Sequence, residues 1–552
     1  MQSRRWKLVA LLAIVLGASL VMAQDEPEAT PESTPTSSVL DMQAAEAEIV
    51  ALFQDSAVTP EQIIRRVDEL VAQYPDSAAI YRVRGDVYAS LEDYEQAILN
   101  YDQAATLDPA NIYALYGRGS AYYLLGEYEQ AIHNYDEVIA LDPNHADALY
   151  YRGIAYGNLG EYEQALNDLD QVSTLYPTYT DAIFGRGEAH YHLGEYEQAL
   201  RDLDEALTLD PANTWVFYGR GLVYTELGEY TKAISDFTEA IALDSTNAAA
   251  FYDRGSAYYF LGEYGRAISD YDQTIILDPA NAMVFYGRGR AYYAQNEYEQ
   301  ALRDFDQAIA LDPASELAIY GRGRVYSDLG HYERAIRDFD EAIALNPTNA
   351  DAFHDRGLAY YLLGEYEQAI HNYDEAIALN STNADTFNNR GVAYLNLGEY
   401  EQAINDFDQA IILNPANTRV FQGRGIAYLS LGNYEQAIND FDQAIALDST
   451  NADAFYNRGL AYGNSGKYRQ AINDFDQAIV LNPTHAAAYY SRGGTYYNRG
   501  RHETDRTLQL QYFRQTVADF DEAEALGVVL PPEIQEIRDY FESSLPTPTP
   551  GS

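Results

Sequence analysis

The stretch that decides the fold is residues 383–415, NADTFNNRGVAYLNLGEYEQAINDFDQAIILNP. It is one copy of a unit that returns every 34 residues, and an Arg-Gly pair marks the same point in each copy. The Arg of this pair occurs at 13 positions: Arg84, Arg118, Arg152, Arg186, Arg220, Arg254, Arg288, Arg322, Arg356, Arg390, Arg424, Arg458 and Arg492. Self-similarity at a constant period of this length predicts a repeat architecture, in which each unit stacks on its neighbours.

Each unit is predicted to form two helices. Apolar residues recur at helical spacing on both sides of Gly398. They are Phe387, Gly391, Tyr394 and Leu397, then Tyr400, Ala403, Ile404, Phe407, Ala410 and Ile411. The position of Gly398 is Gly in 11 of the 13 units and Asn296 in another, so it is predicted to end the first helix in a left-handed conformation. Asn414-Pro415 ends the second helix, and Asn417 is a candidate N-cap for the next one.

Two small residues indicate how the helices meet. The position of Gly391 is Gly in all 13 copies, and that of Ala403 is Ala in 12. Small side chains let two helix backbones approach closely, with aromatic rings filling the space beside them. Because one helix pair cannot bury its apolar faces alone, the core is predicted to run along the stack.

This pattern resembles the tetratricopeptide repeat family over about residues 78–526. The family signature of aromatic, Gly, Tyr, Ala, aromatic, Ala and Pro falls on Phe387, Gly391, Tyr394, Ala403, Phe407, Ala410 and Pro415. The resemblance implies an all-α fold, a right-handed α-solenoid superhelix of helix-turn-helix repeats. It also implies that the first helices line a concave groove, which in the family commonly holds an extended peptide or a helix.

One departure from the family is the repeated Arg, since the family usually has an apolar residue there. The second helix carries an Asp-Phe-Asp motif, as in Asp406-Phe407-Asp408, which lies mid-helix and lacks the turn and closing Glu of a calcium loop. We expect the aromatic ring to face inward and the Arg guanidinium to hydrogen-bond an Asp beside it. Such an Arg–Asp ladder would be structural rather than catalytic.

The segment before the repeats is read in three parts. Residues 1–23 have a basic start, an apolar run at 8–21 and small residues at 21–23, which is typical of a signal peptide. An uncleaved membrane anchor is the alternative, although the run is short for a membrane span. Residues 24–40 are predicted to be a disordered Pro/Thr/Ser/acidic linker, and residues 41–77 a degenerate N-terminal capping repeat.

Thirteen repeats are predicted over residues 78–526, and the last contains an 11-residue insertion near residues 500–510. Arg499, Arg501, Arg506 and Arg514 make this region locally basic. It is predicted to form a lengthened connection, either an interaction loop or a structural loop that pairs with nearby acids. Residues 527–544 are predicted to form a C-terminal capping helix and residues 545–552 a disordered tail.

Composition narrows the function. The chain has 85 acidic and 35 basic residues and a formal net charge of -50. This charge disfavours nucleic acid and anionic lipid as partners, so we expect no nucleic-acid binding and no membrane insertion beyond the signal segment. The acidic surface either serves solubility or meets a basic or metal-bridged partner.

No catalytic, cofactor or metal site is predicted. The chain has no Cys, His190 and His192 are two residues apart and so lie on different faces of a helix, and the Gly-Arg-Gly triplets lack a third glycine and a preceding strand. No Walker loop, nucleophile elbow or zinc-protease motif occurs. We therefore expect a protein that is not an enzyme.

Tyrosines recur at two positions that the resemblance places in the groove, two residues before the repeated Arg and five after it. Tyrosine gives a large contact area and a polar tip, so these side chains either bind a partner or fill gaps between helices. The candidate groove residues are Tyr218, Tyr252, Tyr259, Tyr286, Tyr293 and Tyr320, with Trp215, Met283, Arg290 and Arg324 beside them.

The favoured function is a non-enzymatic protein-interaction scaffold that holds a protein or peptide partner in this groove. The signal segment places it outside the cytoplasm, as an extracellular, cell-surface or periplasmic protein. Two alternatives are a glycan-binding cell-surface protein, with sugar rings stacked on the tyrosines, and an accessory subunit of an envelope enzyme complex.

Overall fold

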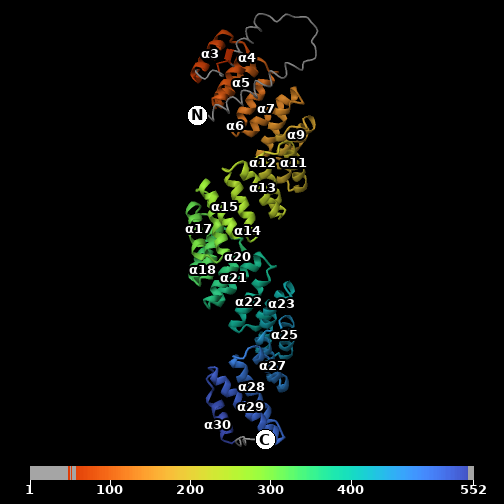
Figure 1. Cartoon of the computed structure of the whole chain (residues 1–552), viewed down its shortest axis with the longest axis vertical. Coiled ribbons are helices and arrows are strands. Elements are labelled where there is room, and N and C mark those ends of the chain that lie inside the picture. The colour runs from red at the N-terminus through yellow and green to blue at the C-terminus, as the bar shows by residue number, and fades with distance from the viewer. Residues whose placement is uncertain (1–47, 50, 53–57, 545–552) are drawn as a thin grey trace. The chain divides into compact units, whose positions relative to one another are not determined.

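The structure is a computed structural model that describes residues 48–49, 51–52 and 58–544. The predicted signal peptide (1–23), linker (24–40) and C-terminal tail (545–552) lie outside the described residues, as do residues 41–47, 50 and 53–57 of the predicted capping repeat. The described chain forms 28 helices and no strand, in successive helix-turn-helix repeats (Figure 1). The predicted all-α solenoid is therefore confirmed.

The chain divides into two compact units, Met1–Pro279 and Ala280–Ser552. In the first unit one helix, α3 (Pro60–Gln73), precedes six repeats. The first helices of these repeats are α4 (Ala78–Ser90), α6 (Ile112–Leu124), α8 (Ala146–Asn158), α10 (Thr180–His192), α12 (Thr214–Glu226) and α14 (Ala248–Phe260). The second helices are α5 (Tyr94–Leu107), α7 (Tyr128–Leu141), α9 (Tyr162–Leu175), α11 (Tyr196–Leu209), α13 (Tyr230–Leu243) and α15 (Tyr264–Leu277).

The second unit contains seven repeats and a final helix, α30 (Pro532–Ser544). The first helices are α16 (Ala282–Ala294), α18 (Glu316–Asp328), α20 (Ala350–Leu362), α22 (Ala384–Leu397), α24 (Thr418–Ser430), α26 (Ala452–Asn464) and α28 (Ala486–Arg501). The second helices are α17 (Tyr298–Leu311), α19 (Tyr332–Leu345), α21 (Tyr366–Leu379), α23 (Tyr400–Leu413), α25 (Tyr434–Leu447), α27 (Tyr468–Leu481) and α29 (Arg506–Ala525).

The turns between paired helices have the left-handed residue that was predicted to end the first helix. Gly398 has φ 80°, in the left-handed region, and the glycines at the same position of the other repeats do likewise except Gly500. Asn296 (φ 60°) and Glu92 (φ 63°) adopt the same conformation without being glycine. For Gly500 the prediction is wrong, because this residue lies inside α28 and packs against Phe513.

In 11 of the 13 repeats the core contains one glycine that faces one aromatic ring, and in the other two Gly153 and Gly187 face Leu169 and Leu203. A Cβ atom built on Gly391 would lie 2.9 Å from Cε1 of Phe407, closer than two carbons pack. Phe407 and Ala403 are fully buried between α22 and α23. The predicted close approach of the two helices is therefore confirmed.

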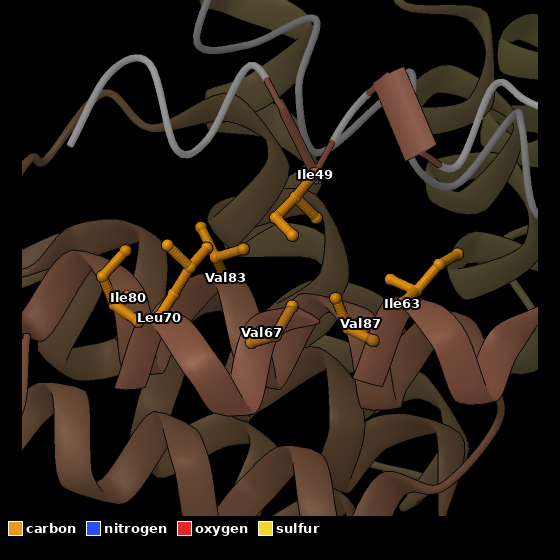
Figure 2. Close-up of a cluster of buried hydrophobic side chains, with 7 residues drawn as sticks. All are labelled: Ile49, Ile63, Val67, Leu70, Ile80, Val83 and Val87. Carbon is orange, nitrogen blue, oxygen red and sulfur yellow. The ribbon is translucent and has the colours of Figure 1, made fainter. Parts of the chain in front are cut away.

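A cluster of aliphatic side chains covers the first of the 13 repeats. Figure 2 shows Ile63, Val67 and Leu70 of α3 packed with Ile80, Val83 and Val87 of α4, and Ile49 beside them. In addition, Arg84 pairs with Asp68, 16 residues earlier, at 2.6 Å. Other repeated arginines reach back 16 residues to the preceding second helix in the same way, as Arg118 does to Asp102 at 2.7 Å, so α3 has the register of a second helix.

The insertion near residues 500–510 is helix rather than the loop that was predicted. It lengthens α28 to 16 residues and α29 to 20, and residues 502–505 join the two. Two of its arginines, Arg499 and Arg501, lie over tyrosine rings, which differs from the expected pairing with acids. The guanidinium of Arg499 lies over the ring of Tyr512 at 4.6 Å, and Arg501 lies over Tyr497 at 5.7 Å. The insertion is therefore accommodated by extending both helices, which adds aromatic contacts between them.

Contacts between repeats show which face is inner. Within each unit the first helices of neighbouring repeats touch one another, as α8 and α10 do. Among the described residues, no successive second helices make such contacts. The first helices are therefore closer together than the second helices. The side chains of the first helices that point away from the second helices line the inner face of each unit.

Candidate functional site

The repeated Arg forms the predicted ladder. In the copy at Arg390, Nε and Nη2 donate to the two carboxylate oxygens of Asp406 at 2.8 and 2.6 Å. Nη1 donates to Asp374 of the preceding second helix at 2.6 Å. This guanidinium thus joins three helices, and charge-assisted forked bonds of this kind are among the strongest that side chains make.

Ten pairs share this forked geometry. They are Arg152–Asp168, Arg186–Asp202, Arg220–Asp236, Arg254–Asp270, Arg288–Asp304, Arg322–Asp338, Arg390–Asp406, Arg424–Asp440, Arg458–Asp474 and Arg492–Asp519. In two other repeats Asn134 and Asn372 take the place of the Asp. The prediction of a guanidinium–carboxylate ladder is confirmed.

In the Arg390–Asp406 pair, burial opposes the charge of both partners. Burial raises the pKa of Asp406 above its ordinary value, and Arg390 offsets this only in part. For Arg390, burial lowers the pKa, but the carboxylates of Asp406 and Asp374 together raise it above its ordinary value. The arginine therefore stays charged, and the ladder is a structural element that holds the first helices in place.

The predicted groove residues fall into two sets, one in each unit. In the first unit, Trp215 and Tyr218 on α12 pack edge to face with their ring centroids 6.4 Å apart. Tyr252 lies 5.7 Å from Tyr271, and Tyr259 lies 5.4 Å from Tyr264. All three tyrosines are half-buried, whereas Trp215 is 61% exposed.

In the second unit, arginines lie over the tyrosines. Arg324 lies 5.1 Å from the ring centroid of Tyr293 and 6.0 Å from that of Tyr320, and Arg290 lies 5.5 Å from that of Tyr286. These distances are in the range of cation–π contacts. Met283 is exposed at the start of α16.

Several tyrosine hydroxyls tie neighbouring repeats together, which the sequence did not reveal. Tyr218 donates to Asp253 at 2.8 Å and Tyr320 donates to Asp355 at 2.7 Å, each 35 residues further along the chain. Tyr293 donates to Asp328 at 2.7 Å, with the same separation. These tyrosines therefore serve packing, one of the two roles left open by the sequence, and present only part of each ring to a partner.

Burial alters the pKa values of the aspartates that accept these hydrogen bonds. It raises the pKa of Asp253 to about 6, against a smaller lowering by the Tyr218 hydroxyl. It also raises the pKa of Asp355 above its ordinary value, although Tyr320 and Arg324 oppose the change. The inner face therefore contains carboxyl groups that hold protons more tightly than surface acids do.

Sequence reasoning missed two of four exposed apolar side chains, which are called the apolar strip here because they share one position in the repeat. The residue five before the repeated Arg lies at the start of each first helix, and in four repeats it is large, apolar or aromatic, and exposed. These residues are Tyr113 and Trp215 in the first unit and Met283 and Leu317 in the second. An alignment of the repeats at the Arg places Tyr113 and Leu317 at the same position as Trp215 and Met283.

No metal site or membrane span was found in the part of the chain that the structure describes. No group of three or more side chains suited to a metal ion occurs there. His190 contacts Glu195 at 2.7 Å, whereas His192 stacks on Tyr162. Among the described helices, none combines the length and the apolar character needed to cross a bilayer.

Family models for tetratricopeptide repeats match most of this array. One, described as a TPR repeat, matches residues 85–126, 119–160, 187–228, 221–262, 323–364, 359–398 and 425–466. Others, described as tetratricopeptide repeats, match residues 146–179, 252–316, 384–417 and 452–485. Together they cover more than half of the chain. The chain belongs to the tetratricopeptide repeat family. This family typically provides non-catalytic scaffolds that bind protein or peptide partners.

Three solved structures are similar to this tetratricopeptide repeat protein. The APC/C hetero-tetramer Cut9–Hcn1 has 17% identity, with 82% of this chain and 95% of that chain covered and a TM-score of 0.39. YrrB, a TPR protein with an unusual peptide-binding site, has 25% identity, coverage of 34% and 97%, and a TM-score of 0.32. MamA has 26% identity, coverage of 31% and 94%, and a TM-score of 0.29. Comparison with curated proteins gave no match.

Proposed function

We propose that the protein is exported and acts as a non-enzymatic scaffold that holds a segment of a partner protein against the inner face of its repeats. The observation that carries this proposal is the apolar strip of each unit, which comprises Tyr113 and Trp215 in the first unit and Met283 and Leu317 in the second. Large apolar side chains that are exposed at the same helix position in several repeats favour an interaction surface on that face. Membership of a family that binds protein or peptide partners supports the same conclusion.

The tyrosines and arginines of the inner face add to this surface. Arg324 has 47% of its side chain exposed while its guanidinium lies over two tyrosine rings. A partner's carboxylate or aromatic ring can meet this cation without displacing it. Because Tyr218 and Tyr320 also tie repeats together, a test of binding is cleaner at the strip than at these tyrosines.

The test is capture of partners from an envelope extract with the tagged full chain. The Trp215→Ser/Met283→Ser variant is compared with the wild type and with Ile412→Ser, which changes an exposed second-helix residue (72% exposed) away from the inner face. We expect one protein to be held by the wild type and by Ile412→Ser and lost from the strip variant. Equal capture by all three would contradict use of the inner face, and capture of glycan without protein would favour the glycan-binding alternative.

The proposal of export depends on residues 1–23 and is tested by a separate measurement. We expect N-terminal mass spectrometry to find a chain that begins at Gln24 in the extracellular, surface or periplasmic fraction. A chain recovered outside the cytoplasm with residues 1–23 intact would show a retained anchor instead. Recovery of the intact chain from the cytoplasm alone would refute export.

A further inference from the structure

The repeat of α8 and α9 lacks a tyrosine ring that both adjacent repeats contain, at Tyr123 and Tyr191. Five residues after the repeated Arg, five repeats place a tyrosine ring against the first tyrosine of their own second helix. These pairs are Tyr123–Tyr128, Tyr191–Tyr196, Tyr259–Tyr264, Tyr293–Tyr298 and Tyr361–Tyr366, with centroids 5.4 to 6.1 Å apart. In the repeat of α8 and α9 that position is Gly157, and a Cβ built on it would have no atom within 4 Å. The partner ring, Tyr162, is present.

The missing ring leaves a cavity of about 190 Å³ between α8, α9 and α10, here called the Gly157 pocket. Ile154, Leu169 and Tyr162 form much of its wall, together with Gly157 and Gly185. The second glycine widens it, since the equivalent residue one repeat earlier is Tyr151, whose ring lies 5.9 Å from Tyr123. The pocket thus lies where a tyrosine ring lies in the adjacent repeats and has a similar lining.

The volume and the lining of the Gly157 pocket suit an aromatic side chain from another protein. An apolar cavity of about 150 Å³ is known to accept benzene, so this pocket has room for one ring. One wall is flat and aromatic, because His192 stacks on Tyr162 with a centroid distance of 4.6 Å and an interplanar angle of 11°. Ile154 and Leu169 provide aliphatic contact on the other sides.

A carboxylate lies in the same lining. Glu188 of α10 is exposed to solvent, yet it forms no ion pair or hydrogen bond with any residue that the structure describes. Partial desolvation of its carboxyl group by neighbouring protein atoms raises its pKa above the ordinary value. A cation placed beside Glu188 would lower this pKa and favour the charged carboxylate. The net charge of -50 also attracts a basic partner.

We propose that the Gly157 pocket binds an aromatic side chain of a partner protein segment, with a Lys or Arg of that segment beside Glu188. The inference rests on the proposed scaffold function and deepens it by naming the chemistry of the partner. It assigns a binding site to a repeat that contributes none of the ten candidate groove residues.

The probe is the peptide acetyl-Gly-Lys-Phe-Lys-Gly-amide, measured by calorimetry against the full chain. Gly157→Tyr restores the ring that five other repeats carry and should fill the pocket without disturbing the fold, since space for the side chain is present. We expect it to weaken peptide binding by about tenfold or more, as loss of a buried ring does. Glu188→Gln keeps the shape of the side chain and should weaken binding severalfold.

The matched control is Gly463→Tyr, which changes a glycine at the same position of the repeat that contains α26, in the other unit. It should leave the peptide affinity unchanged. Equal binding by Gly157→Tyr and the wild type, or no binding by the wild type, would overturn the proposal. If Gly157→Tyr still captured the envelope partner, the pocket proposal would fail while the scaffold function would stand. If the peptide bound at the pocket but no envelope protein were captured, only the scaffold function would fail.

Discussion

The guanidinium of Arg492 donates to the carboxylate of Asp519, with 2.6 Å between Nη2 and Oδ1, although 27 residues separate them. In the preceding repeat the same bond joins Arg458 and Asp474, which are 16 residues apart. The intervening insertion extends α28 and α29 and leaves their contact at this point unchanged. The pairing is therefore a property of the helix interface and does not depend on the length of the connection.

We predict that Arg390→Met destabilises its repeat by about 3–5 kcal/mol, because it leaves Asp406 buried without a counter-charge. Unfolding of a repeat array is not two-state, so one global free energy would hide the effect. Hydrogen exchange followed by mass spectrometry, read on peptides from residues 383–415, gives the local value.

The control for this prediction is Asp406→Asn. Asn already occupies the equivalent position in two repeats, where Asn134 and Asn372 accept from Arg118 and Arg356. Exchange rates should therefore stay close to those of the wild type, and the double variant with Arg390→Met should recover much of the lost protection. If Arg390→Met alone left exchange unchanged, the ladder would have no stabilising role.

Most of the fold could be predicted from the sequence because each feature recurs many times. The register of Gly391 against an aromatic ring, the left-handed residue at Gly398 and the pairing of Arg390 with Asp406 follow from local spacing and side-chain chemistry. The errors lie where the repeat is broken. Gly500 is not a cap because the inserted residues continue the helix, and periodicity cannot tell an extended helix from a longer loop.

The candidate site was less predictable, because it depends on residues in adjacent repeats. The tyrosines were found, but their hydroxyl partners lie 35 residues away, as Asp253 does from Tyr218, and occur only in some repeats. The Gly157 pocket gives a still weaker signal, since it arises from a side chain that is missing. Seven of the 13 copies lack Tyr at this position, and a comparison of the copies narrows the search only to the two glycines, Gly157 and Gly463.

We predict opposite effects for alanine at two helical glycines. Gly391→Ala would place a Cβ 2.9 Å from the ring of Phe407, so it should destabilise the repeat by about 1–3 kcal/mol. Gly494→Ala, in α28, meets no atom within 4 Å and should stabilise its helix by up to about 1 kcal/mol through helix propensity alone. Local hydrogen exchange measures both, and a stabilising Gly391→Ala would refute the close packing of Gly391 and Phe407.

The stability of the repeats around Tyr218 should depend on pH through Asp253. Its pKa is about 6 in the folded protein, against about 4 in an unfolded chain. The folded state therefore binds this proton more tightly, so the free energy of unfolding falls as the pH rises from about 4 to 6 and stays lower above that. Asp253→Asn removes the ionisation and should stabilise these repeats at pH 7 by up to about 2 kcal/mol, with the gain shrinking toward pH 5.

Trp215 reports on this change locally, since it neighbours Tyr218 and is the one tryptophan outside residues 1–23. Urea unfolding followed by its fluorescence between pH 5 and 8 avoids the sequence pI of about 4.3, where the chain carries little net charge. Tyr218→Phe is the matched variant: it removes the hydrogen bond that lowers the pKa of Asp253, so the loss of stability with rising pH should extend to higher pH. A pH dependence that is identical in the wild type and Asp253→Asn would show that another group causes it.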